Sequence, residues 1–483
     1  MTRTFPQFIL AFSLILMLAG VVQAEQMKPN IVIILADQWR AQATGYAGDP
    51  NLQGKTPNLD QLQRQSIDFT NAVSGMPVCT PFRASLLTGQ YAQTHGLFLN
   101  DLQLPDDADT MAEILGRAGY ETGFIGKWHL DGHGRRAPIP QERHQGFDYW
   151  KVLECTHDYN NSYYYEGDQE IIQHWEDYDA FAQAKDAEAY IAQRAKSEKP
   201  YALILSWGPP HNPYQSAPES FRAMFDAESI QLRPNVTDPK YKKDLAGYYA
   251  HIAALDHSLG ELLATIDATG EAKNTILIFT SDHGDMIGSQ NLIRKQKPWD
   301  ESIRVPFLLR YPAAHGDEGR IITTPLNTPD ILPTLLGLSD VGIPGSVEGR
   351  DWSTVIRSSE NPPDAPALIA CIAPFGEWIR KKGGKEFRGV RTARYSFVMD
   401  RMGPWLLFDN ENDPYQMENL VNHPELSDVQ SLLKIHLVTL LEDRKDAFLH
   451  GDEYVKQWGY TVNENGTVPY ANEIPEESRI KQP

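Results

Sequence analysis

Cys79 is the residue of this chain whose surroundings point most clearly to chemistry. Thr80 and Pro81 follow it and predict the start of a helix, with threonine as the N-cap and proline as the first helical residue. Cys79 then lies among free backbone N–H groups at the positive end of the helix dipole, where an anion is stabilised. Arg83 adds a cation one turn later. The pattern predicts a nucleophile for an anionic substrate; the alternative is an inert cysteine buried at a turn.

Two apolar runs that predict buried strands each end in a polar pair. Asp37 and Gln38 follow the first run, and Asp282 and His283 follow the second. Ligands of open α/β sheets bind beyond the carboxyl ends of the strands, so we expect these side chains to meet at one edge. Their oxygen atoms favour calcium or magnesium over zinc, and His283 is the softer ligand. Helix caps or turn residues are the alternative.

Basic residues also follow expected strands. Lys127 and His129 lie two residues apart at the end of one strand, so their side chains point to the same side. His211 follows the strand 201–206 in a loop stiffened by prolines, and Lys295 precedes an aromatic–acidic pair by four residues. Taken singly, Lys127 is more often a solvated loop lysine, and His211 more often a surface histidine, than a catalytic residue.

Together these motifs resemble the type I sulfatase family. Its first signature is matched by Cys79, Pro81 and Arg83, which are followed by the apolar pair Leu86 and Leu87 and then by Thr88 and Gly89. The run 119–129 is similar to its second signature at every restricted position. The resemblance extends from Pro29 to about Asp446.

The resemblance implies a set of functional roles. Cys79 would be oxidised to formylglycine, whose hydrate attacks sulfur, with Arg83 beside it. One calcium ion would be bound by Asp37, Gln38, Asp282, His283 and the modified Cys79. The family often has aspartate where this chain has Gln38, which leaves that ligand open. Lys127 and Lys295 would stabilise the sulfuryl oxygens, His211 or Lys295 would assist the leaving alcohol, and His129 would deprotonate the second hydroxyl.

The order of the predicted elements indicates an α/β fold. Apolar strands alternate with helices, which predicts a mostly parallel central sheet sandwiched by helices, alkaline phosphatase-like by resemblance. Beyond about residue 342 the alternation fades, and a smaller C-terminal α+β subdomain built on an antiparallel sheet is expected. We expect a signal peptide at 1–24, a catalytic domain at 25–345, and a C-terminal subdomain and tail at 346–483. The irregular stretch 130–178 is expected to form a rim over the site, in which Arg135 and Arg136 either read a further anionic group or are simply solvated.

The N-terminus predicts export. Arg3 precedes the apolar run 8–22, and Val22-Gln23-Ala24 offers a cleavage site, so the mature protein would be periplasmic or extracellular, or lysosomal or secretory in a eukaryote. An uncleaved anchor is the alternative, but the run is short for a membrane span. We expect no stable membrane insertion after cleavage. Cys155 and Cys371 either pair or stay free.

Charge and motifs together favour one function. The formal net charge of −20 argues against nucleic-acid binding. The expected activity is hydrolysis of sulfate esters, on a sulfated polysaccharide or oligosaccharide, with a formylglycine-generating or sulfatase-maturating enzyme as partner. The rivals are a phosphonate or phosphate ester hydrolase of the same superfamily and a catalytically silent sulfoglycan-binding protein.

Overall fold

The computed structural model describes residues 28–358, 360 and 362–470. The expected signal peptide lies outside the described residues. Among the described residues, no helix combines the length and apolar character needed to cross a membrane.

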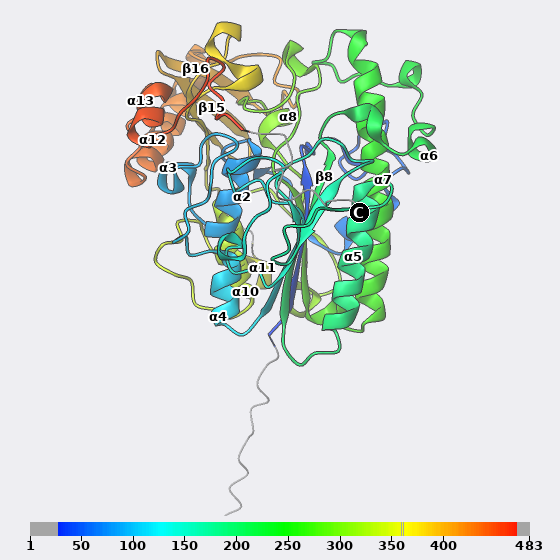
Figure 1. Cartoon of the computed structure of the whole chain (residues 1–483). Helices are drawn as coiled ribbons and strands as arrows, with labels where there is room; N and C mark the ends of the chain where they lie inside the picture. The colour runs from blue at the N-terminus through cyan, green and yellow to red at the C-terminus, as the bar shows by residue number, and fades with distance from the viewer. Residues whose placement is uncertain (1–27, 359, 361, 471–483) are drawn as a thin grey trace, which may run out of the picture.

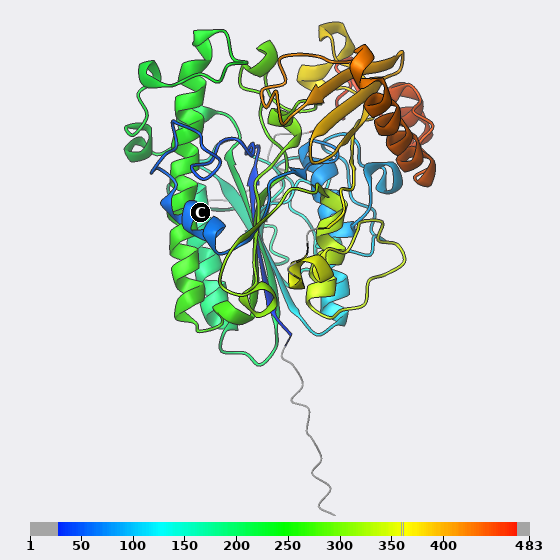
Figure 2. The same ribbon diagram turned by 180° about the vertical axis from the view of Figure 1, so that it is seen from behind.

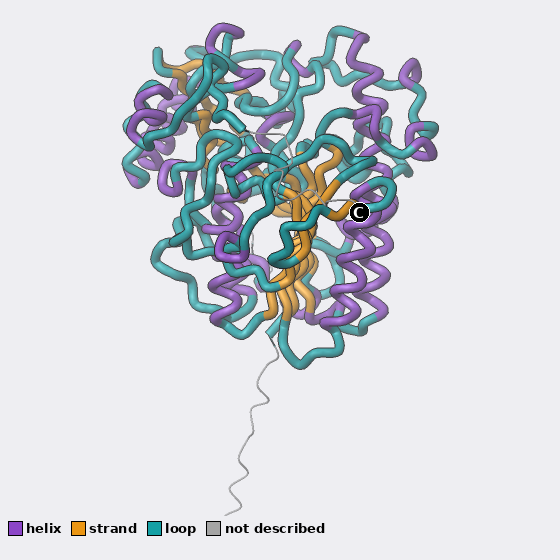
Figure 3. The backbone as a smooth tube through the Cα atoms, in the orientation of Figure 1, coloured by secondary structure: helices purple, strands orange, loops and turns teal. Residues whose placement is uncertain are grey.

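A twisted sheet of ten strands runs through the centre of the molecule, seen nearly edge-on in Figure 3. Its middle strands β9, β1, β8, β4 and β5 are parallel, and β10, β6 and β7 add antiparallel pairs toward the edges. In spatial order the strands are β11 (Arg320–Ile322), β2 (Ile67–Phe69), β10 (Phe307–Arg310), β9 (Thr275–Ser281), β1 (Asn30–Asp37), β8 (Tyr201–Pro210), β4 (Glu121–Lys127), β5 (Tyr149–Leu153), β6 (Tyr163–Glu166) and β7 (Gln173–His174).

Helices cover both faces of this sheet (Figures 1 and 2). The side chains of β1 alternate between the two resulting cores: Ile31 packs into one and Val32 into the other. This two-sided burial explains why β1 is apolar without a break. One face carries α1 (Pro57–Arg64), α5 (Asp179–Arg194) and α7 (Lys242–Ala268); the other carries α2 (Cys79–Thr88), α4 (Met111–Arg117), α10 (Ile331–Leu338) and α11 (Ser353–Arg357). The predicted α/β sandwich is confirmed.

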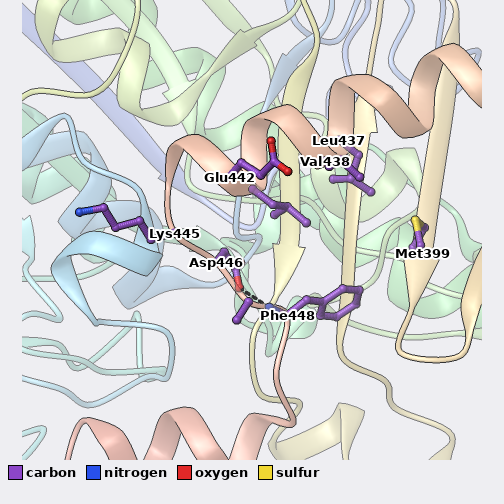
Figure 4. Close-up of a pocket in the computed structure, with 9 residues that line it drawn as sticks. Met399, Leu437, Val438, Glu442, Lys445, Asp446 and Phe448 are labelled. Atoms are coloured by element: carbon purple, nitrogen blue, oxygen red, sulfur yellow. Dashed lines mark hydrogen bonds between the residues drawn. The ribbon is translucent and has the colours of Figure 1, made fainter.

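The C-terminal part is built on a second sheet, antiparallel throughout, as expected. Its strands are β13 (Ala367–Cys371), β14 (Phe387–Arg391), β15 (Tyr395–Asp400) and β16 (Gly403–Asp409), and α12 (Ser427–Asp443) packs against it. A groove of about 500 Å³ opens between α12 and β15 (Figure 4). The remaining short helices are α3 (Ala92–His95), α6 (Glu219–Arg222), α8 (Asp300–Ile303), α9 (Pro312–His315) and α13 (Gly451–Gln457), and β3 (Ala72–Val73) pairs with β12 (Leu326–Asn327).

Several sequence expectations differ from the structure. The sequence pattern of residues 67–73 predicts a single strand, but the structure divides it into β2 and β3, which belong to different sheets. The stretch 130–178 is not wholly irregular, because β5, β6 and β7 extend the central sheet there. The composition of the tail beyond residue 446 predicts loops, but the tail contains α13. Strands β5, β6 and β7 have only two to five residues each, which is too short for a clear period in the sequence. Cys155 and Cys371 are both free.

A buried ion pair ties the tail to the C-terminal sheet. Arg388 Nε on β14 lies 2.5 Å from Asp446 Oδ2, and neither side chain is exposed. The Tyr454 hydroxyl of α13 donates to the same carboxylate. Burial acts to raise the pKa of Asp446, but the charge of Arg388 outweighs it and lowers the pKa to about 2.

Asp446→Asn is therefore expected to destabilise the fold by about 3–5 kcal/mol near neutral pH, because it leaves a buried guanidinium without its anion. The folded-state pKa of Asp446 is depressed, so the stabilisation is present above the unfolded pKa of about 3.9 and is lost as pH falls toward about 2. Thermal melting of both proteins between neutral pH and about pH 3 checks this: the Tm gap should narrow as the pH falls. A difference in Tm that stays constant over this pH range would contradict the ionised pair of Asp446 and Arg388.

Candidate active site

The predicted catalytic and metal-binding side chains converge at the carboxyl ends of β1, β4, β8 and β9 and at the start of α2, and Lys295 joins them from the loop before α8. The groove of Figure 4 is lined by none of them. Cys79 is the first residue of α2, not the residue before it, and the N-cap is Val78. Thr80 does not cap the helix, because its hydroxyl donates to the His129 carbonyl at 2.9 Å. The fold therefore uses the predicted capping residue to fasten the β4 loop beside Cys79.

Cations surround the Cys79 thiol. Lys295 Nζ lies 2.9 Å and Lys127 Nζ 3.8 Å from its sulfur. His283 Nε2 lies 3.2 Å from the same atom. Burial and the nearby Asp37 carboxylate act to raise the pKa of Cys79, but the charges of Lys127, Lys295 and His283 outweigh them and lower it well below its usual range. The position of residue 79 is therefore built to hold negative charge.

The two predicted carboxylates face each other across the site. Asp37 accepts from Lys127 Nζ at 2.6 Å, and Arg83 Nη2 lies 3.4 Å from both Asp37 and Asp282. Burial and the like charge of Asp37 raise the pKa of Asp282 to about 6. Arg83 is held in place by Ser206, whose hydroxyl accepts from its Nη1 at 2.7 Å.

A metal ion fits between these groups. One ligand atom from each of Asp37, Cys79, Asp282 and His283 lies within 4.8 Å of the others, and all four residues are buried. His283 Nδ1 is hydrogen-bonded to the Gly284 carbonyl at 2.9 Å, so Nε2, which lies 3.2 Å from the Cys79 sulfur, is the nitrogen directed at the site. A cation here would relieve the repulsion between the two carboxylates.

Gln38, the fifth predicted ligand, has an unpaired side-chain oxygen. Its Nε2 donates to Asp285 Oδ2 at 2.5 Å, while its buried Oε1 has no hydrogen-bond partner. Asp285 is in turn hydrogen-bonded by the Tyr214 hydroxyl. A buried acceptor without a donor suits a cation. Gln38 therefore stays a predicted oxygen ligand in place of the aspartate common in the family.

Gln38→Ala is accordingly expected to weaken Ca²⁺ binding about tenfold or more, because it removes one oxygen ligand and releases Asp285. Calorimetric titration of the metal-free protein with Ca²⁺ measures this directly. Gln53→Ala is the matched control, since the Gln53 side chain bonds the Gly45 carbonyl outside the site. Equal affinities of the two variants would exclude Gln38 as a ligand.

His211 and His129 approach residue 79 from different loops. His211 Nε2 lies 3.3 Å from Lys295 Nζ, and its ring stacks on that of His157 at 4.5 Å. Burial and the charges of Lys295 and His157 hold the pKa of His211 well below its usual range, so its ring is neutral. His129 Nε2 lies 3.2 Å from Asp101 Oδ1, and its buried Nδ1 has no hydrogen-bond partner.

The two rim arginines have partners within the protein. Arg135 forms two hydrogen bonds with Asp101, and Arg136 lies 4.6 Å from the centre of the Tyr163 ring. A role of either residue in substrate binding stays a prediction. The sequence interpretation missed Asp101 and Ser206. Ser206 could have been predicted from the sequence, because this residue ends an expected strand. Asp101 lies in a loop without any periodic signal.

Comparison with known proteins identifies the family of this chain. Residues 29–341 match the family model described as Sulfatase, and residues 288–443 match the model for the C-terminal part of N-sulphoglucosamine sulphohydrolase. The chain is 47% identical to an ulvan-active sulfatase of Formosa agariphila, over 93% of this chain and 88% of the relative. It is 30% identical to an endo-4-O-sulfatase of Bacteroides thetaiotaomicron, over 88% of this chain and 94% of the relative.

A solved structure from work on glycosaminoglycan metabolism by Bacteroides thetaiotaomicron superposes with a TM-score of 0.78 at 28% identity. The match covers 89% of this chain and 99% of that one. The mostly parallel sheet and the smaller antiparallel subdomain thus agree with this structural neighbour. The chain belongs to the type I sulfatase family and is a sulfuric ester hydrolase.

Proposed function

We propose that this sulfatase removes sulfate from a sulfated carbohydrate, with formylglycine at position 79 and one calcium ion in the site. One observation carries the proposal: Lys295, Lys127 and Arg83 converge on Cys79 and on the two carboxylates beside it. With both carboxylates ionised and a divalent ion bound, the site has an excess of positive charge suited to a sulfate ester.

Calcium is proposed because the available ligands are mainly oxygen atoms. Asp37, Gln38 and Asp282 supply carboxylate and amide oxygens, which Ca²⁺ prefers over nitrogen or sulfur. The Cys79 sulfur stands in for a hydroxyl oxygen of the formylglycine hydrate. When bound, the cation would withdraw electrons from the sulfuryl group and favour the ionised form of that hydroxyl.

The hydrate solves a problem that a serine side chain would have. One of its hydroxyls attacks sulfur, and the other remains available to expel sulfate and restore the aldehyde. Lys127 and Lys295 hold the sulfuryl oxygens. A unit charge pair at 4 Å contributes about 4 kcal/mol at an effective dielectric constant of 20. Only the part gained in the transition state accelerates the reaction.

Proton transfers are assigned to the two histidines. The leaving alcohol takes its proton from His211 or Lys295, which lie in contact. Binding of an anionic substrate favours protonation of His211, because its negative charge offsets that of the nearby lysine. His129 Nδ1, which has no other partner, takes the proton of the second hydroxyl.

The carbohydrate class is supported by the relatives. The Formosa protein is described as ulvan-active, and the Bacteroides protein as an endo-4-O-sulfatase. The N-terminal pattern supports export to the periplasm or the extracellular space, where such polymers occur. A formylglycine-generating or sulfatase-maturating enzyme is the implied partner for Cys79.

The proposal is tested by assaying the matured chain in parallel on an aryl sulfate, an aryl phosphonate and a panel of sulfated oligosaccharides. We expect sulfate release from the aryl sulfate and from at least one oligosaccharide, with much slower phosphonate cleavage. Faster turnover of the phosphonate would favour the phosphonate hydrolase. Binding of the oligosaccharides without release of sulfate would favour a silent sulfoglycan-binding protein.

A further inference from the structure

Asp101 links the proposed base to a charged partner outside the reacting groups. Its Oδ1 lies 3.2 Å from His129 Nε2 and accepts from Arg135 Nε at 2.7 Å. Its Oδ2 accepts from Arg135 Nη2 at 2.8 Å. The side chains of Asp101 and Arg135 are 6% and 15% exposed, so little water competes for this bidentate pair.

The bidentate pair determines which ring nitrogen of His129 carries a proton. Arg135 donates to both oxygens of Asp101, so this carboxylate only accepts hydrogen bonds. It therefore keeps a hydrogen on Nε2, so the proton that His129 gains or loses is the one on Nδ1. Burial acts to lower the pKa of His129, but the charge of Cys155 and the hydrogen bonds with Asp101 and Cys79 raise it to about 9. Nδ1 is the buried nitrogen that has no hydrogen-bond partner.

The backbones that carry both residues are held in unusual conformations beside residue 79. His129 has φ 59° and Asp101 has φ 64°, in the left-handed region that non-glycine residues seldom occupy. Thr80 ties both segments down: its N–H donates to Asn100 Oδ1 at 3.2 Å, and its hydroxyl donates to the His129 carbonyl. The orientation of the His129 ring is therefore fixed relative to the nucleophile.

The C-terminal tail completes this arrangement. The Arg135 guanidinium lies 3.7 Å from the centre of the Tyr470 ring. The same tail packs against the segment that leads to Asp101: the Tyr460 hydroxyl donates to the Gly96 carbonyl at 3.0 Å, and a Cβ at Gly96 would collide with the Trp458 ring. An aromatic face over a guanidinium restricts its orientation.

From these contacts we propose that Tyr470, Arg135 and Asp101 form a clamp that positions His129 for proton abstraction at residue 79. This assigns Arg135 a positioning role within the protein, distinct from reading a substrate anion. The proposal rests on the proposed function for the identity of the proton donor, but the geometry of the clamp is independent of the state of residue 79.

The kinetic test compares Asp101→Asn with the wild type. The asparagine amide has only one acceptor oxygen for the donors of Arg135, so its NH₂ group turns toward His129 Nε2 and imposes the wrong tautomer. We expect kcat to fall about 10²–10³-fold with KM changed less than about threefold, as for other carboxylates that orient a catalytic histidine. A kcat equal to wild type, or a raised KM with unchanged kcat, would overturn the clamp.

Tyr470 offers a matched pair on an exposed side chain, so folding is not at risk. Tyr470→Phe keeps the ring over Arg135, and its kcat should stay within about twofold of wild type. Tyr470→Ala removes the ring, and its kcat should fall several-fold at unchanged KM. Equal kcat values for the two variants would show that Tyr470 does not help to position His129.

A spectroscopic measurement separates the clamp from the formylglycine proposal. Nitrogen-15 NMR of labelled histidine is recorded on the unmatured chain that still carries Cys79, at a pH above the raised pKa of His129 of about 9, where the ring is neutral. It reports the tautomer of His129, with the signal assigned by His129→Gln. We expect hydrogen on Nε2 in the wild type and on Nδ1 in Asp101→Asn. The same tautomer in both proteins would overturn the clamp, whereas failure to find formylglycine in the active enzyme would overturn only the proposed function.

Discussion

Replacing Cys79 with alanine is expected to lower kcat by more than about a thousandfold, because the residue that becomes the nucleophile is removed while its surroundings stay in place. The substitution deletes one buried sulfur at the first position of α2, where alanine is well tolerated. The loss should therefore appear in turnover and leave the thermal stability nearly unchanged. Release of sulfate from an aryl sulfate measures the effect.

The control for this variant is Cys371→Ala. Cys371 is equally buried and free but lies on β13 of the C-terminal sheet, and burial raises the pKa of its thiol to about 12. It should retain the turnover of the wild type. Substantial turnover by Cys79→Ala would show that another residue attacks the ester, and the proposed nucleophile would be wrong.

Lys127→Met is expected to lower kcat/KM by about 10²–10³-fold, the usual cost of removing one preorganised donor to developing negative charge. Lys127 is 2% exposed and lies 2.6 Å from Asp37. Methionine fills the same space without the charge, so it removes the contact to the sulfuryl oxygens and leaves Asp37 with a weaker set of partners. Steady-state kinetics on the matured variant measures the loss.

Lys151→Met provides the matched comparison on the neighbouring strand. Lys151 belongs to β5 and pairs with Asp186 at 2.7 Å, away from the site residues. Its loss should leave kcat/KM within a few-fold of wild type. Mass spectrometry must show equal conversion of Cys79 in both variants. If both substitutions then had the same effect, Lys127 would not contact the reacting group.

The sequence predicted the parts of the site that depend on the ends of strands. Asp37 and Asp282 follow long apolar runs, and such runs become buried neighbouring strands whose carboxyl ends meet. The position of Lys127 could be predicted for the same reason. The α/β sandwich followed from the alternation of these runs with helices.

Contacts between distant loops were beyond the reach of the sequence. Asp101 contacts His129, and Tyr470 contacts Arg135, only in the folded structure, and no residue spacing in the sequence predicts either contact. Thr80 has the composition of a helix cap, yet its hydroxyl bonds the β4 loop. A local preference of about 1 kcal/mol is easily outweighed by such a tertiary hydrogen bond in a buried place.

The state of residue 79 in the active enzyme tests the account most directly. Mass spectrometry of the tryptic peptide that ends at Arg83 should be combined with turnover, for preparations made with and without a maturating enzyme. The account predicts formylglycine at position 79, in a fraction that rises in proportion to kcat. Full turnover by a preparation that contains only unmodified cysteine at position 79 would contradict it.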